Sequence, residues 1–190
     1  ERYKNSPAVK YWQVENEPFL DFGVCPVADY ALVDKEIETV RNSDNSRKII
    51  VTDSGELSFW ISAAKRGDIF GTTMYREVVS KRLGAWKYPI GPNFFKFKKL
   101  LINVFAGKNN AIVVELQGEP WLQGWTVNFP LEEQLVSMNS DKLKDNVQFA
   151  KNSGFSDIHV WGAEWWYYLK VQKNYPDIWE EARKIFAENN

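Results

Sequence analysis

Two short segments of the chain combine an apolar run with glutamates. Val9–Pro18 (VKYWQVENEP) carries Glu17, and Ala111–Trp121 (AIVVELQGEPW) carries Glu115 and Glu119. Each run has the length and β-branched content of a buried parallel strand, which places these glutamates near strand ends. Burial penalises the charge of a carboxylate, so acids at such positions favour chemistry over stability. Two carboxyl groups facing one bond could act as general acid/base and nucleophile, the pair that hydrolyses glycosidic bonds.

Strand-like and helix-like segments alternate along the chain. Apolar runs predict strands near Val9–Val14, Lys48–Thr52, Asp68–Thr73, Ala111–Glu115 and Asp157–Trp161. Amphipathic patterns predict helices over Val27–Asn42, Leu57–Arg66, Asn93–Phe105, Asp141–Asn152 and Pro176–Glu188. Asp53 or Ser54 is expected to cap the helix that begins near Leu57. Repeated strand–helix units of this kind indicate an α/β fold with a parallel sheet.

Both an open doubly wound sheet and part of a TIM (β/α)8 barrel have this order of elements. The barrel is favoured, because no strand is followed by the glycine-rich loop of a nucleotide-binding sheet. The reactive residue types also follow several different strands, as in barrel active sites. A whole barrel takes about 250 residues. We therefore expect residues 1–190 to be a single domain that holds strands four to eight with their helices and lacks strands one to three.

The two glutamate motifs resemble those of clan A of the glycoside hydrolases, which are retaining enzymes built on (β/α)8 barrels. Gln13–Pro18 (QVENEP) is similar to the Asn-Glu-Pro signature that ends strand four in this clan. The resemblance implies that Glu17 is the general acid/base and that Asn16 binds the 2-hydroxyl of the sugar. It also implies that the nucleophile ends strand seven, the position of Glu115. Glu119 is the alternative nucleophile, and Glu115 is preferred because residues in loops are less firmly positioned.

The same resemblance implies sugar-contacting residues after strands six and eight. A tyrosine after strand six hydrogen-bonds the nucleophile in many clan A barrels, and Tyr75 is the candidate; a tyrosine packed at the rim is the alternative. A tryptophan after strand eight forms the floor of the cleavage site, and both Trp161 and Trp165 qualify. Glu164 could bind sugar hydroxyls or form a salt bridge within the scaffold. Loop tryptophans often stack on sugars, which predicts this role for Trp86, Trp121 and Trp125.

Composition limits the other classes of function. The chain has 24 Lys plus Arg and 25 Asp plus Glu, so its net charge does not favour a nucleic-acid partner. One cysteine, Cys25, and one histidine, His159, exclude a disulfide framework and a Cys/His metal site. His159 lies inside a predicted strand and is expected to be structural. No metal ion or organic cofactor is expected, and no apolar run is long enough for a transmembrane helix.

One basic and aromatic segment has no acidic residue between Glu77 and Glu115. It could bind a membrane surface or an acidic polymer. We expect no membrane contact, because the apolar side of its short helix is needed for packing against the sheet. The segment contains Lys81, Arg82, Lys87, Lys96, Lys98, Lys99 and Lys108 together with Phe94, Phe95, Phe97 and Phe105.

The sequence therefore predicts a retaining O-glycoside hydrolase that cleaves a β-linked oligo- or polysaccharide by double displacement. A non-catalytic glycan-binding or scaffold barrel is the alternative. Five strands alone would expose two sheet edges. We therefore expect these 190 residues to be inactive by themselves and to need the missing N-terminal part of the barrel, or to associate with themselves.

Overall fold

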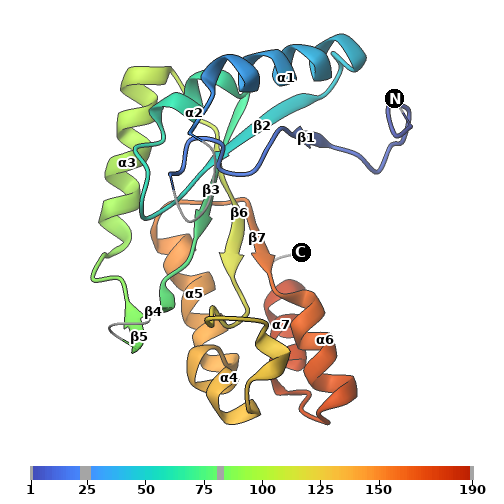
Figure 1. Cartoon of the computed structure of the whole chain (residues 1–190), viewed down its shortest axis with the longest axis vertical. Coiled ribbons are helices and arrows are strands. Elements are labelled where there is room, and N and C mark those ends of the chain that lie inside the picture. The colour runs from blue at the N-terminus through green and yellow to red at the C-terminus, as the bar shows by residue number, and fades with distance from the viewer. Residues whose placement is uncertain (1, 22–26, 81–83, 189–190) are drawn as a thin grey trace. The chain divides into compact units, whose positions relative to one another are not determined.

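Five strands pair in the order in which they occur along the chain. The structure, a computed structural model, describes residues 2–21, 27–80 and 84–188 (Figure 1). The order β1-β2-β3-β6-β7 contains no reversal, and the β1–β2 and β2–β3 pairs are parallel. A doubly wound sheet reverses its order at a switch point, so this topology is consistent with part of a (β/α)8 barrel. The strands are β1 (Tyr11–Gln13), β2 (Lys48–Asp53), β3 (Ile69–Met74), β6 (Ala111–Gln117) and β7 (Ile158–Trp161).

The chain divides into two compact units. The first unit comprises Glu1–Thr73 and Asn93–Val114, and the second comprises Met74–Pro92 and Glu115–Asn190. The division passes through β3 and β6, so both strands contribute residues to each unit. The expectation of a single barrel portion over residues 1–190 stays a prediction.

Three aromatic side chains pack together in the core of the first unit. Trp60 is fully buried between Phe70 of β3 and Phe95 of α3 (Pro92–Ala106), with ring centroids 4.9 and 6.0 Å away. Ile49 and Val51 of β2 are also fully buried. Such burial explains the apolar run Ile49–Val51 in the middle of β2. The helices of this unit are α1 (Tyr30–Ser43), α2 (Ile61–Arg66) and α3 (Pro92–Ala106), whose first residue belongs to the second unit.

The second unit has its own helical core. Met138, Leu143, Trp166, Leu169 and Ile178 pack together in it. An antiparallel hairpin, β4 (Glu77–Ser80) and β5 (Gly84–Lys87), also belongs to this unit. Its helical segments are η1 (Thr126–Asn128), α4 (Leu131–Ser137), α5 (Ser140–Asn152), α6 (Ala163–Gln172) and α7 (Asp177–Ala187).

Each predicted strand and helix is present, and five elements of the described residues were not predicted. These are the two strands of the β4–β5 hairpin, the short helix η1 and the helices α4 and α6. Helix α6 (AEWWYYLKVQ) carries aromatic residues on both its buried and its exposed sides, so its sequence has little helical periodicity.

Helix α2 begins later than the sequence suggests. We expected a start near Leu57 with a cap at Asp53 or Ser54, but the helix starts at Ile61 behind Trp60, whose φ is 73°. The Asp53 carboxylate instead accepts a hydrogen bond from the Ser54 amide at 3.0 Å. The capping prediction is therefore wrong, because no helix begins near Leu57.

Helix α3 carries apolar residues on more than its packed side. Phe95 and Ile102 are buried, as expected of the side that packs on the sheet. Several other apolar residues of this helix stay exposed: Phe97, Leu100, Val104 and Phe105. The expectation of no membrane contact stays a prediction. Within the described residues, no helix is long and apolar enough to span a membrane. Lys81, Arg82 and Cys25 lie outside the part of the chain that the structure describes.

Lys98 is a buried cation in the core of the first unit. Its Nζ donates hydrogen bonds to the carbonyl oxygens of Gly55 at 2.6 Å and Ser58 at 2.5 Å, and it lies 4.2 Å from the centroid of the Trp60 ring. Removal from water outweighs these contacts and the nearby negative charges, and lowers the pKa of Lys98 to about 8.

This lowered pKa predicts a stability that rises at alkaline pH. Between about pH 8 and 10.5 the folded chain releases the Lys98 proton before the unfolded chain does, so the free energy of unfolding increases with pH. The shift from 10.5 to about 8 corresponds to about 3 kcal/mol. Denaturant unfolding at pH 7 and pH 10.5 should show this increase in the wild type and in Lys96→Met, an exposed-lysine control, but not in Lys98→Met. Equal pH dependence in Lys98→Met would contradict the assignment.

Candidate active site

Two buried threonines hold Glu17 at the carboxyl end of β1. The Glu17 amide donates to Thr52 Oγ1 at 2.8 Å, and Thr73 Oγ1 donates to Glu17 Oε1 at 2.7 Å. Both main chain and carboxylate are thus held from the ends of β2 and β3. Glu15 and Glu17 have φ values of 57° and 50°, a left-handed conformation that costs free energy for residues other than glycine. A strained backbone conformation that its surroundings hold firmly in place is typical of functional positions.

Asn16, like its neighbour Glu15, is exposed in this turn. Its Oδ1 accepts a hydrogen bond from Gln13 Nε2 at 3.2 Å, and Gln13 also donates to the carbonyl of Glu15 at 3.1 Å. Asn16 is therefore oriented by its own strand while its side chain still reaches solvent.

Glu115, within β6, accepts a hydrogen bond from Tyr75. The Tyr75 hydroxyl lies 3.1 Å from Glu115 Oε2, and the Tyr75 ring packs edge-on against Trp121 at a centroid distance of 5.1 Å. Burial raises the pKa of Glu115, and the bond from Tyr75, which favours the charged form, opposes part of this rise. Tyr75, Glu115 and Trp121 are thus brought together in the second unit, and Trp121 keeps a solvent-exposed face.

Glu119 has a different partner and more negative surroundings. The indole Nε1 of Trp161 donates to Glu119 Oε1 at 3.1 Å. The pKa of Glu119 is raised chiefly by burial, the bond from Trp161 lowers it, and the negative charges of Glu164 and Glu115 raise it further. Because β6 runs to Gln117, Glu115 lies two residues before its end and Glu119 two residues after it. The strand-end argument therefore does not separate the two glutamates.

Two glycines let the chain segments carrying Glu119 and Trp161 approach closely. The Gly118 amide donates to the Trp161 carbonyl at 2.8 Å, and a Cβ on Gly118 would lie 2.6 Å from that oxygen. A Cβ on Gly162, whose φ is 133°, would lie 2.8 Å from the Gly118 carbonyl carbon. Larger residues at either position would separate Trp161 from Glu119.

The two candidate tryptophans after β7 have different environments. Trp161 is 50% exposed, whereas Trp165 is 4% exposed and packs in the core of the second unit with its Nε1 bonded to Gln134 at 2.8 Å. The expectation of sugar contact is wrong for Trp165, since its rings are covered by protein. Glu164 is exposed in the first turn of α6, where a negative charge suits the helix N-terminus. His159 is exposed beside Asp157 at 3.1 Å.

The loop after β6 forms a pocket of about 420 Å³. Trp125, which is 81% exposed, lines it together with Trp121 and Glu119. Trp86, in β5, is also exposed and does not line this pocket. An open pocket with two accessible indole rings and one carboxylate can take a ligand with both apolar faces and hydroxyl groups, such as a sugar.

Sequence reasoning did not identify the two threonines around Glu17. Thr52 and Thr73 come from neighbouring parallel strands, so their strand-end positions could have signalled that they lie at the same sheet edge as Glu17. Among the residues that the structure describes, no group of three or more His, Cys, Asp and Glu side chains could hold a metal ion.

No protein-family model matches the chain, and no curated protein matches it. Among solved structures, the chain is similar to the native form of the β-glucanase SdGluc5_26A from Saccharophagus degradans. The sequences are 18% identical, the TM-score is 0.43, and the match covers 84% of this chain and 46% of that one. The complex of the same β-glucanase with cellotetraose matches with 17% identity, a TM-score of 0.44 and the same coverage. The chain thus spans about half the length of these proteins.

Proposed function

We propose that this chain carries both carboxyl groups of a retaining glycoside hydrolase that acts on a β-linked glycan. The observation that supports it best is that one glutamate of each motif accepts a hydrogen bond from a hydroxyl at or just beyond β3. Thr73 donates to Glu17, and Tyr75 donates to Glu115. Each bond directs a carboxylate oxygen, and the bond from Tyr75 also favours the charged form of Glu115 that a nucleophile requires.

In the proposed reaction Glu115 is the nucleophile and Glu17 the general acid/base. A Glu115 oxygen attacks the anomeric carbon while Glu17 gives its proton to the leaving oxygen, so the glycosidic bond breaks and a glycosyl ester forms. Water then attacks the same carbon as Glu17 takes its proton, which releases the sugar with retained configuration. This chemistry requires the two carboxyl groups to come within about 5–5.5 Å during the reaction.

Glu115 is preferred over Glu119 as nucleophile on electrostatic grounds. A nucleophile must be ionised, and the pKa of Glu119 is raised by two neighbouring carboxylates in addition to burial. Burial alone raises the pKa of Glu115, and Tyr75 opposes it. Glu119 and Trp161 would instead contact sugar hydroxyls and the sugar face, together with Asn16, Trp121 and Glu164. No metal or cofactor takes part in this proposal.

A non-catalytic glycan-binding protein is the second candidate. The exposed indoles of Trp121 and Trp125 favour it, since they could bind a glycan without any reaction.

Covalent trapping distinguishes the two candidates. The full-length protein would be incubated with activated 2-deoxy-2-fluoro-glycosides of glucose, galactose, mannose and xylose and analysed by peptide mass spectrometry. We expect an adduct on Glu115 with one of these reagents. Glycan binding without an adduct would favour the non-catalytic candidate, and an adduct on Glu119 would reverse the assignment of the nucleophile.

The bond from Tyr75 predicts a shift of the pH profile. Tyr75→Phe removes a contact that lowers the pKa of Glu115, so that pKa rises further. Because the nucleophile must lose its proton, the acidic limb of kcat/KM against pH should move to higher pH, and activity above this limb should change less. Tyr88→Phe is a control from the same unit. An unshifted acidic limb in Tyr75→Phe would show that Tyr75 does not act on the nucleophile.

A further inference from the structure

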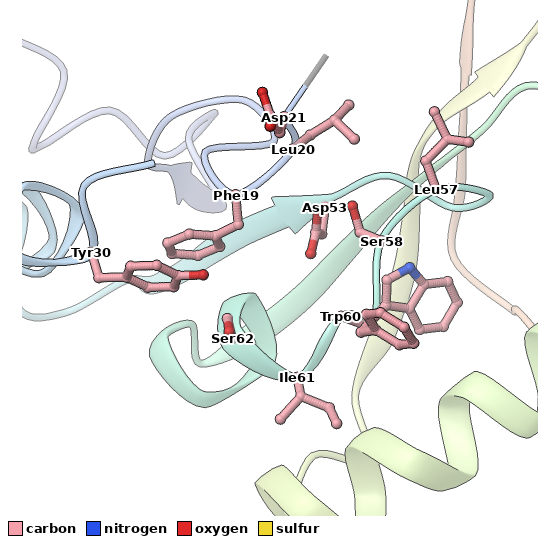
Figure 2. Close-up of a pocket in the computed structure, with 11 residues that line it drawn as sticks. Phe19, Leu20, Asp21, Tyr30, Asp53, Leu57, Ser58, Trp60, Ile61 and Ser62 are labelled. Atoms are coloured by element: carbon pink, nitrogen blue, oxygen red, sulfur yellow. The ribbon is translucent and has the colours of Figure 1, made fainter. Parts of the chain in front are cut away.

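A second pocket, of about 430 Å³, lies within the first unit between the turn after β1 and the turn after β2 (Figure 2). Phe19 and Tyr30 stack on one side of it with their ring centroids 4.7 Å apart. Phe59 belongs to the opposite turn and is 84% exposed. Such an exposed aromatic ring at the edge of a pocket is suited to stacking on a ligand.

Polar groups converge on the same space. Figure 2 shows the carboxylate of Asp53 beside the hydroxyl of Ser58, with Ser62 and the hydroxyl of Tyr30 nearby. Asp53 accepts hydrogen bonds from the Ser54 amide, the Ser58 hydroxyl and the Trp60 amide. Asp53 is 2% exposed and lines the pocket, so it is a buried acceptor at the wall of this space. Aromatic faces beside one buried acceptor and several hydroxyls match a pyranose ring, whose faces are apolar and whose rim carries hydroxyls.

Two hydrogen bonds of the Glu17 main chain link this residue to the pocket. The Glu17 amide bonds to Thr52, the residue before Asp53, and the Leu20 amide bonds to the Glu17 carbonyl at 3.0 Å. These two hydrogen bonds thus link Glu17, the proposed acid/base, to both turns that line the pocket. That group protonates the oxygen of the leaving sugar, so the leaving sugar must lie on its side of the bond that breaks.

We propose that the pocket formed by Phe19, Tyr30, Asp53, Ser58 and Phe59 binds the sugar unit on the leaving-group side of the scissile bond. This assignment rests on the proposed function of Glu17 and Glu115. The same pocket would hold an incoming sugar acceptor, whose hydroxyl oxygen attacks the anomeric carbon as Glu17 takes its proton and the ester to Glu115 breaks.

Reactivation of the trapped enzyme tests this site. The full-length protein is first labelled with a 2-fluoro-glycosyl fluoride, whose leaving group has no sugar, and then reactivated with cellobiose, laminaribiose or β-1,4-mannobiose. We expect saturable reactivation in the wild type. The half-saturating disaccharide concentration should rise about tenfold in Phe59→Ala, because stacking is lost. It should also rise in Tyr30→Phe. The labelling rate should change less than about twofold in either variant. Phe97→Ala, at an exposed phenylalanine of α3 outside the pocket, should behave as wild type.

The outcomes separate the two proposals. Suppose that both Phe59→Ala and Tyr30→Phe are labelled normally and have the same half-saturating disaccharide concentration as the wild type. That result would overturn the assignment of this pocket and leave the proposed function standing. Absence of labelling in a folded wild-type protein would overturn the proposed function and the assignment of the pocket with it.

Discussion

Glu115→Gln is expected to lower kcat/KM for β-glycosides by at least about 10⁴-fold, because an amide cannot form the glycosyl ester. Glutamine keeps the shape of the side chain and can still accept the hydrogen bond from Tyr75. The loss should therefore arise in the chemical step, with the fold unchanged. Steady-state kinetics with aryl glycosides and thermal unfolding of both proteins would measure the two effects separately.

Glu119→Gln is the matched control for this substitution. Glu119 is half-buried like Glu115 and accepts a hydrogen bond from Trp161. We expect a loss of about 10- to 100-fold, as for a group that binds a sugar hydroxyl through one charge-assisted bond. Glu115→Ala with added azide should form an α-glycosyl azide from a β-glycoside, since azide takes the place of the nucleophile. If Glu119→Ala gave that product instead, Glu119 would be the nucleophile.

Glu17→Ala is expected to lower kcat/KM for oligosaccharides by about 10²- to 10⁴-fold, the usual contribution of a general acid. The loss should be much smaller for a 2,4-dinitrophenyl glycoside, because its leaving group departs without a proton. Hydrolysis of the glycosyl ester also needs Glu17 as base, so this intermediate should accumulate, and azide should speed its release as a β-glycosyl azide. Rates for the two leaving groups, with and without azide, would measure this.

Glu15→Ala is the control for Glu17→Ala. Glu15 has the same left-handed backbone conformation and is exposed two residues away in the same turn. Its rates should stay within about threefold of wild type for both substrates. Equal losses for the two leaving groups in Glu17→Ala would mean that Glu17 maintains the turn and transfers no proton. A stronger effect of Glu15→Ala on oligosaccharides would assign the acid to Glu15.

The sequence by itself was sufficient for the α/β class, the positions of the five strands of the larger sheet and the candidate carboxylates. Buried parallel strands need near-continuous apolar runs, and the segments that became β2, β3 and β6 have them. These signals lie within the sequence of each strand, so they can be recognised without knowing which strands pair. The helices α4 and α6 had weaker local signals, because the first is short and the second has aromatic residues on several sides.

Only the tertiary structure decided which side chains meet. Trp161 and Trp165 are equivalent by position, yet the first reaches Glu119 and the second fills a core, because β7 ends and α6 begins between them. The bonds of Glu17 to Thr52 and of Glu115 to Tyr75 join residues far apart in the chain. Such contacts depend on strand register and loop path, which are set by the packing of the whole sheet and leave no local pattern in the sequence.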